Sequence, residues 1–433
     1  MTQTNKSHAL PIIMMIALFG MIAFVTNLAA PMGVVLMNQF EVGAGAGMLG
    51  NLANFIAYAV IGIPAGIMLQ RMGYKSTALT AVVVGFVGVG IQFLAGHVGG
   101  NAAFGVYLLG AFVAGISMAL LNTVVNPMLN TLAGGGNKGN QLIQLGGSFN
   151  SLLATFTPAF VGILIGEAAR AQISDVFPVM YIAMGVFAVI FVVLWLSSIP
   201  EPHAESSDEP IGTLISGALS YRHFVLGAIA IFMYVGVEVA TPALMFTWLS
   251  LDAGSGGLGY GPIIAGSVAG TYWLMMLIGR LTGAAIGGKV APRVMLTTGA
   301  SFALLFVLLA IFLPTTTEVS MPLMSEAADG SLSFGLTTVP INAMFVVLVG
   351  LCTSIMWGCI YNLAVEGLGK FTAIASGIFM VMVMGGGILP AVQGWVSQGV
   401  GFQMSYWVVI AGFAYILFFA LVGSKRASKD TPQ

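Results

Sequence analysis

The stretch that decides the fold class is residues 176–199, which read VFPVMYIAMGVFAVIFVVLWLSSI and contain no charged side chain. A helix needs about 20 apolar residues to cross the hydrocarbon core of a bilayer. Similar apolar runs fall at about 9–37, 46–70, 76–97, 103–133, 139–168, 216–249, 258–288, 293–314, 337–365, 369–398 and 402–424. None of these runs shows the two-residue alternation of a transmembrane β-strand. The sequence therefore predicts an all-α membrane protein with twelve transmembrane helices.

The composition excludes most other classes of protein. Of 433 residues, 58% are hydrophobic and 6% are charged, whereas soluble domains are about 25% charged. The formal net charge of −1 gives no reason to expect a nucleic acid partner. The glycine run 134–139 lacks a full phosphate-loop pattern. Cys352 and Cys359 match no zinc or redox spacing. We therefore expect no enzyme activity, no cofactor and no structural metal.

The basic residues predict the orientation of the chain. If the N-terminus is cytoplasmic and every run crosses the membrane, eleven of the thirteen basic residues fall on the cytoplasmic side. These are Lys6, Arg71, Lys75, Lys138, Arg222, Lys289, Arg293, Lys370, Lys425, Arg426 and Lys429. Such an excess follows the positive-inside rule. Both termini are predicted to be cytoplasmic, with the first span an uncleaved membrane helix, and a bacterial inner membrane is the expected location.

The polar segment after residue 199 divides the chain into two parts. We interpret residues 1–199 and 216–433 as two bundles of six helices, joined by a cytoplasmic linker at 200–215. An internal repeat supports this division, because five residues recur at an offset of 232. They are Asn130, Lys138, Pro158, Ala159 and Gly162, matched by Asn362, Lys370, Pro390, Ala391 and Gly394. At an offset of 211, Pro31 matches Pro242 and Asn27 matches Glu238. Two parallel halves of this kind are typical of transporters that rock about a site at the membrane midplane.

One acidic residue lies deep in a predicted span. Glu238 is near the middle of the seventh run, and an acidic residue there costs roughly 2.5–3.5 kcal/mol on insertion scales. Burial favours the neutral form of a carboxyl group, so Glu238 is a candidate for coupling transport to H+. Three alternatives are a sodium ligand, an acceptor of hydrogen bonds from a substrate, and a structural pair with Arg280 of the eighth run. For Arg280 itself, a structural or gating role is the favoured interpretation.

Amide side chains recur in the spans at helical spacing and are our candidates for substrate binding. A neutral polyhydroxylated solute needs groups that both donate and accept hydrogen bonds, and its C–H faces pack on aromatic rings. The alternative is that amides hold helices together. No cluster of buried basic residues suggests a phosphorylated substrate. The candidate set is Asn27, Asn51, Asn54, Asn122, Asn126, Gln144, Asn150 and Asn362, together with Trp357.

Prolines within the spans are candidates for the bends that gating needs. They are Pro31, Pro158, Pro242 and Pro390, with the glycines 385–387 close to the last of them. Close packing of helices explains the same residues about equally well.

Several short motifs together resemble a known family. The segment Gly66-Ile-Met-Leu-Gln70-Arg71-Met-Gly73-Tyr-Lys75 is similar to the loop motif of the major facilitator superfamily, with Gln70 in place of the usual Asp, and the resemblance gives Arg71 a gating role. Further motifs, spread over nearly the whole chain, resemble the fucose–glucose–galactose:cation symporter branch. They are Ile63-Pro-Ala-Gly66, Asn126-Pro127, Ser148-Phe-Asn-Ser151, Tyr234-Val-Gly-Val-Glu238, Ile278-Gly-Arg280 and Gly385-Gly-Gly387.

The chain departs from that branch at the residues that fucose symporters use. By position, the first-span Asp falls on Ala30, the fourth-span Glu on Asn122 and the sugar-binding Gln on Gly147. The resemblance implies a secondary active sugar transporter of the major facilitator fold that works by alternating access. The expected partners are a sugar, H+ or Na+ as the coupling ion, and the lipid bilayer. We expect the protein to be a monomer. The alternatives are an uncoupled sugar uniporter and an efflux carrier for amphipathic compounds, which the 26 methionines would suit.

Overall fold

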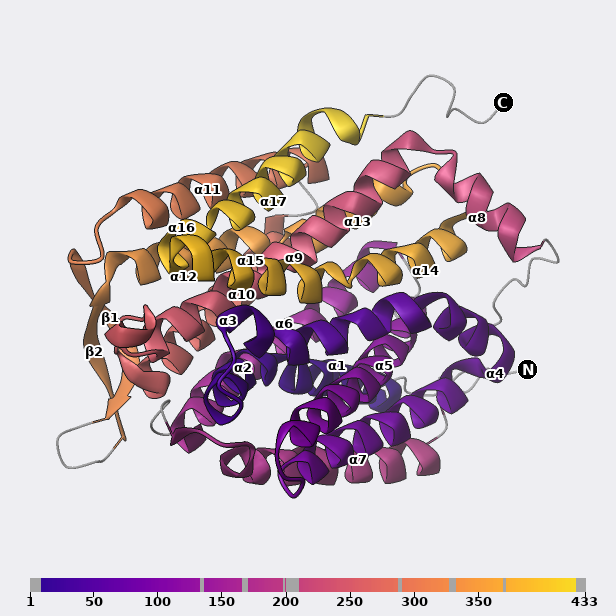
Figure 1. The fold of residues 1–433 in the computed structure, drawn as a ribbon. Helices are drawn as coiled ribbons and strands as arrows, with labels where there is room; N and C mark the ends of the chain where they lie inside the picture. The colour runs from indigo at the N-terminus through magenta and orange to yellow at the C-terminus, as the bar shows by residue number, and fades with distance from the viewer. Residues whose placement is uncertain are drawn as a thin grey trace.

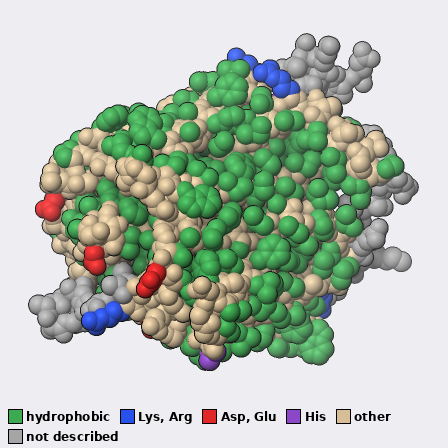
Figure 2. Space-filling model, in the orientation of Figure 1, with side chains coloured by type: hydrophobic (Ala, Val, Ile, Leu, Met, Phe, Trp, Pro, Cys, Tyr) green, Lys and Arg blue, Asp and Glu red, His purple; other side chains and the backbone are tan. Residues whose placement is uncertain are grey.

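A computed structural model of the chain describes residues 9–132, 136–165, 170–197, 199, 210–286, 290–326, 332–368 and 371–425. Within these ranges, twelve helical segments are long and apolar enough to cross a membrane. The prediction of twelve spans is thus confirmed. Apolar side chains cover most of the visible face of the molecule, and the few charged ones lie toward its edges (Figure 2). A surface of this kind is suited to lipid rather than to water.

The N-terminal half forms the lower layer of the molecule as seen in Figure 1. Its spans are long, and α4 continues through two of them. Gly73 interrupts α4 with φ 79°, so the chain turns there between the second and third spans. The elements are α1 (Ala9–Asn27), α2 (Ala29–Gln39), α3 (Ala44–Gly47), α4 (Leu49–Ala95), α5 (Asn101–Leu132), α6 (Gly136–Ile165), a short 3-10 turn (Ile173–Val176) and α7 (Phe177–Leu196).

The C-terminal half forms the upper layer (Figure 1). Several of its spans consist of two consecutive helices. The elements are α8 (Ile211–Leu219), α9 (Arg222–Ser250), a 3-10 turn (Ala253–Ser255), α10 (Gly261–Ile286), α11 (Pro292–Phe312), β1 (Glu318–Glu326), β2 (Leu332–Pro340), α12 (Ile341–Thr353), α13 (Met356–Val365), α14 (Thr372–Met382), α15 (Gly385–Val400), α16 (Phe402–Ser405), α17 (Trp407–Phe418) and a π-helical end (Phe419–Gly423). Residues 201–209 of the predicted linker lie outside the described residues, and α8 begins in its last part.

The first span is divided at Leu28, between α1 and α2. Pro31 explains the break, because proline has no N–H to donate to the carbonyl four residues earlier and its ring crowds that carbonyl. The carbonyl concerned belongs to Asn27. Pro242 leaves the Glu238 carbonyl without its helical donor in the same way, although α9 continues through it. Both halves therefore have a polar residue beside a weakened turn at matching positions of the repeat.

The two halves meet along two seams of closely packed helices. In the first seam α4 packs against α14 and α15, and in the second α6 packs against α10. Glycines allow the approach: a Cβ on Gly387 would lie 2.9 Å from the Leu52 Cα, and one on Gly162 would lie 2.5 Å from the Pro262 carbonyl oxygen. Gly394, the repeat partner of Gly162, faces Ala44 across the first seam. The matched residues of the repeat thus lie at equivalent places in the interface.

A β-hairpin lies between α11 and α12, at the turn from the ninth to the tenth span. Strands β1 and β2 pair antiparallel, with Glu318 opposite Pro340 and Glu326 opposite Leu332. The backbone N–H of Met324 donates a hydrogen bond of 2.8 Å to the hydroxyl of Ser267, which ties the hairpin to α10. The hairpin marks one end of the bundle and α8 marks the opposite end (Figure 1). We call these the hairpin end and the linker end.

Candidate functional site

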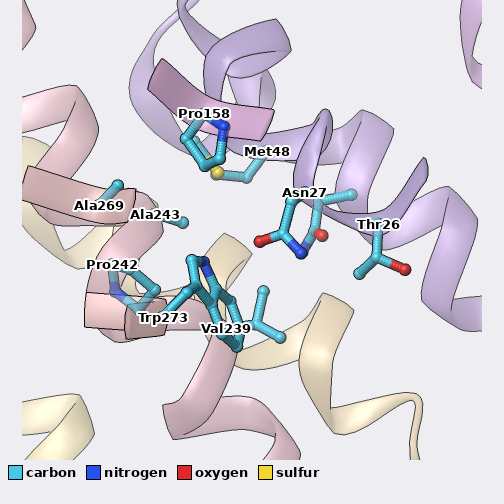
Figure 3. Close-up of a pocket in the computed structure, with 10 residues that line it drawn as sticks. Thr26, Asn27, Met48, Pro158, Val239, Pro242, Ala243, Ala269 and Trp273 are labelled. Carbon is cyan, nitrogen blue, oxygen red and sulfur yellow. The ribbon is translucent and has the colours of Figure 1, made fainter. Parts of the chain in front are cut away.

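A small cavity lies between the two halves, where the first and seventh spans meet both seams. It is lined by Thr26, Asn27, Met48, Asn51 and Pro158 of the N-terminal half and by Val239, Pro242, Ala243, Ala269 and Trp273 of the C-terminal half. Figure 3 shows Asn27 facing the indole of Trp273 and the ring of Pro242 across this space. The cavity measures about 20 Å³, enough for one water molecule. The conformation described is therefore closed around the space that a larger solute would occupy.

Two of the predicted substrate-binding amides reach this cavity. Asn27 is the last residue of α1 and donates a hydrogen bond of 2.9 Å to the Ala23 carbonyl one turn earlier. Asn51 lies in the first turn of α4 and donates one of 2.7 Å to the carbonyl of Gly386 in the other half. The Asn51 side-chain oxygen is buried and has no hydrogen-bond partner among the described residues. Both amides thus retain hydrogen-bonding capacity toward the cavity.

Glu238 lies beside the cavity in a polar cluster of the C-terminal half. Its Oε1 accepts a hydrogen bond of 2.8 Å from the Tyr234 hydroxyl. The same oxygen is 3.6 Å from Nη2 of Arg280, and both side chains are largely buried, at 12% and 14% exposure. The pairing with Arg280 that the sequence left open is therefore present. The negative charge of the buried Glu238 carboxylate is balanced by Arg280. It would be left unbalanced if Arg280 moved away.

Arg280 also connects the halves. Its Nη1 donates to the Gly147 carbonyl at 2.6 Å and to the Ser151 hydroxyl at 2.9 Å, both on α6. A Cβ at position 147 would lie 3.4 Å from this nitrogen, so a long side chain there would displace the guanidinium. By position, the sugar-binding glutamine of fucose symporters falls on Gly147. In this chain the guanidinium of Arg280 lies beside that glycine. The gating role predicted for Arg280 stays a prediction, with this contact as its basis.

The remaining N-terminal amides stay within their own half. Asn122 donates to the Tyr58 hydroxyl at 2.9 Å, and Asn126 donates to the Asn122 backbone carbonyl at 3.0 Å. Asn150 donates to the Phe19 carbonyl at 2.9 Å. Asn54 is buried where α4 meets Gly115 of α5. In this closed conformation Asn122 and Asn150 connect helices, which is the alternative that the sequence left open. Asn126 bonds within α5, and the buried side-chain oxygen of Asn54 has no hydrogen-bond partner among the described residues.

The other predicted site residues lie apart from the cavity or lack a described side chain. Trp357 packs on the Tyr234 ring, with centroids 6.2 Å apart, and so borders the Glu238 cluster. Asn362 lies five residues further along α13 and is exposed. The side chains of Gln144 and Arg71 lie outside the described residues. Pro31 and Pro242 are buried in the interior of the bundle.

Sequence reasoning did not select Trp273, although its side chain forms a wall of the cavity (Figure 3). It is 8% exposed and meets the Tyr272 ring edge-on, with centroids 5.2 Å apart. Several tryptophans and tyrosines occupy the C-terminal spans, and the sequence gives no signal that separates one facing the other half from one facing lipid.

Twelve spans, two matching halves and a cavity between them that includes two amides define a membrane transporter with alternating access. The sequence matches the model of the Major Facilitator Superfamily over residues 12–389, and the chain belongs to this family. It is a multi-pass integral membrane transporter and not an enzyme, as predicted.

Named relatives lie in the branch whose motifs the sequence resembles. A glucose/galactose transporter of Brucella abortus is 30% identical, over 98% of this chain and 96% of its own length. The L-fucose-proton symporter of Escherichia coli is 23% identical, over 98% and 95%. A crystal structure of the E. coli fucose:proton symporter has a TM-score of 0.68 at 21% identity, covering 97% of this chain and 100% of that one. That structural likeness establishes the shared fold.

Proposed function

We propose that this chain is a secondary active transporter of a small neutral polyhydroxylated solute, a hexose in the first instance. The observation that carries the proposal is the cavity between the halves, which combines the amides of Asn27 and Asn51 with the indole of Trp273. Amides donate and accept hydrogen bonds with hydroxyls, and an indole offers an apolar face to sugar C–H groups. The names of the Brucella and E. coli relatives support the same class of substrate.

The absence of charge at the cavity wall favours a neutral cargo. None of the ten residues that line the cavity is basic or acidic, so an anionic or cationic solute would lose its hydration without a counter-charge. The charged groups nearby, Glu238 and Arg280, are paired with each other. We assign them to coupling and not to cargo binding.

Glu238 is proposed to couple transport to protons. Neutralising its carboxyl removes the charge that faces Arg280, and Arg280 is then held only by its contacts with Gly147 and Ser151 of the other half. A proton on Glu238 would thus change how firmly the second seam holds together. The first-span and fourth-span acids of fucose symporters are missing here, which leaves Glu238 as the buried acid of the described spans.

We also propose how the protein is oriented in the membrane and that it is a monomer. We place the linker end and both termini in the cytoplasm and the hairpin end outside, because of the distribution of basic residues. A bacterial inner membrane, a monomeric state and domain limits at 199 and 216 complete the proposal. Sodium in place of the proton is an outcome that the coupling experiments distinguish.

Ligand-induced thermal stabilisation of the purified protein tests the choice of substrate. D-glucose, D-galactose, L-fucose and a non-sugar amphipathic cation are added in turn, with and without sodium. We expect at least one hexose to raise the melting temperature in a saturable manner, since a ligand that binds only the folded state stabilises it. Stabilisation by the amphipathic cation alone would contradict the proposal and favour efflux.

A further inference from the structure

The contact between Asn51 and Gly386 joins the two halves at the edge of the cavity. The Asn51 amide is 2% exposed and donates to the Gly386 carbonyl at 2.7 Å. That carbonyl is available because of Pro390, which stands four residues later and has no N–H for it. A side chain of the N-terminal half therefore supplies a hydrogen bond that α15 cannot make for itself.

Among the described residues, such a contact exists on the first seam only. The interface pairs Ala44 with Gly394 and Leu52 with Gly387 on the first seam. On the second seam it pairs Pro262 with Gly162 and Gly270 with Thr155. The helices α4 and α10 are thus related by an offset of 218, and the counterpart of Asn51 is Ala269. Ala269 also lines the cavity, but it has no amide to offer.

The other atom of the Asn51 amide is unpaired. Its Oδ1 is buried without a partner among the described residues, on a side chain that lines the cavity. A buried acceptor left without a donor is costly. A hydroxyl of the cargo would supply that donor, and turning the amide toward the cargo would draw its N–H away from the Gly386 carbonyl.

We propose that the hydrogen bond from Asn51 to Gly386 holds the first seam closed, and that a cargo hydroxyl that binds Asn51 breaks this bond and lets the seam open. We call this hydrogen bond the clasp. This inference rests on the proposed transport of a hydroxyl-bearing solute and assigns Asn51 a positioning role between the halves. It also gives Pro390 a role other than bending the helix, because the proline keeps the Gly386 carbonyl free for the clasp.

Distance measurements between spin labels test the clasp in the full-length protein. Labels are placed on cysteines at Asn101 and Ser255, exposed positions at the hairpin end of opposite halves, after Cys352 and Cys359 are replaced by alanine. Pro390→Ala restores an N–H that competes with Asn51 for the Gly386 carbonyl. We expect the ratio of separated to closed distances without sugar to rise roughly 3- to 10-fold.

Pro158→Ala is the matched control, because Pro158 is the repeat partner of Pro390 on the seam where no amide among the described side chains crosses. If both substitutions change the distances equally, proline bending and not the clasp controls the seam, and the proposal is overturned. Asn51→Asp removes the donor but keeps an acceptor, and it should open the seam as Pro390→Ala does. Unchanged distances in both Pro390→Ala and Asn51→Asp would also overturn the proposal.

Addition of a hexose that stabilises the wild-type protein completes the test. In the wild type the hexose should shift the distances in the same direction as Pro390→Ala, and in that variant it should add little. The distances without sugar report on the clasp even if no hexose binds. A failure of the clasp can therefore be separated from a failure of the proposed substrate class.

Discussion

Near the cavity, several residues lie four positions before a proline, so that their backbone carbonyls lack a helical hydrogen-bond donor. Asn27 and Glu238 each stand four residues before a proline, as Gly386 does in the first seam. Within an apolar bundle these positions can hold a hydrogen-bonding side chain and an available carbonyl without breaking a span. This explains why matching positions of the two halves carry prolines although the polar residues beside them differ.

Trp273→Ala should weaken hexose binding by about tenfold, because the indole is the aromatic wall of the cavity. Trp273→Phe should lose less, since it keeps an apolar ring. Thermal titration with the bound hexose measures both affinities. Trp195→Ala is the control, because Trp195 is 63% exposed on α7 and lies outside the cavity. Equal losses in the two alanine variants would contradict the assignment of Trp273.

Glu238→Gln should reduce accumulation of hexose under a proton gradient by about tenfold or more, because glutamine cannot change its charge as access alternates. Exchange of labelled for unlabelled hexose without a gradient should continue. Uptake by proteoliposomes with an acidic exterior measures both processes. Glu318→Gln, at an exposed carboxylate at the base of β1, should behave as the wild type. Gradient-driven accumulation that survives Glu238→Gln would refute the coupling role.

At the scale of helices, the two seams depend on close approach of backbones. Gly387 and Gly394 on one seam, and Gly162 and Gly270 on the other, lie where a Cβ would meet the opposite half. Such packing forms a tight interface without large interlocking side chains. The seams can therefore separate and re-form with little rearrangement of rotamers, as alternating access requires.

Gly387→Ala should lower the free energy of unfolding by about 1–3 kcal/mol or shift the seam toward its open form. A Cβ there would lie 2.8 Å from the Phe55 Cβ and 2.9 Å from the Leu52 Cα. Gly377→Ala on α14 is the matched control, because a Cβ there meets nothing within 4 Å. Thermal melts together with the spin-label distances check both variants. No difference between them would argue against tight packing in the first seam.

Much of the helical framework follows from the sequence alone, because the cost of burying charge and unpaired backbone in lipid leaves few alternatives. The twelve spans belong to this part, as does the bend near Pro31. The β-hairpin does not, since its strands contain Pro322 and Gly335 and resemble a loop.

The site is harder to predict. Helical spacing shows on which face of a helix an amide lies, but it does not show which helix packs against that face. Asn27 and Asn51 face the other half, whereas Asn122 and Asn54 pack within their own. The partners of Arg280 on α6 also depend on which helices adjoin in the tertiary structure. A comparison of the contacts in the two seams shows which helices are neighbours, whereas a single sequence does not.

At the scale of the whole molecule, the account requires that the hairpin and the linker lie on opposite sides of the membrane. The hairpin end carries β1 and β2, and α8 lies at the far end of the bundle (Figure 1). An even number of spans places both termini on one side. In this arrangement, rocking of the two halves can open one end of the bundle at a time.

Single cysteines at Glu205, in the predicted linker, and at Ser325, in the hairpin, should react with an impermeant maleimide from opposite sides. In intact cells we expect position 325 to be labelled and position 205 to be protected until the membrane is permeabilised. Labelling of both positions from the same side would contradict the proposed topology. The background variant without Cys352 and Cys359, both buried, provides the baseline.

Uptake of a radiolabelled hexose by proteoliposomes, under separately imposed proton and sodium gradients, tests whether the protein is a proton-coupled sugar transporter. We expect an inward proton gradient to drive D-glucose, D-galactose or L-fucose above the external concentration, and a sodium gradient alone not to do so. If none of these hexoses enters faster than in protein-free vesicles under either gradient, the cavity between the halves does not serve the transport proposed for it.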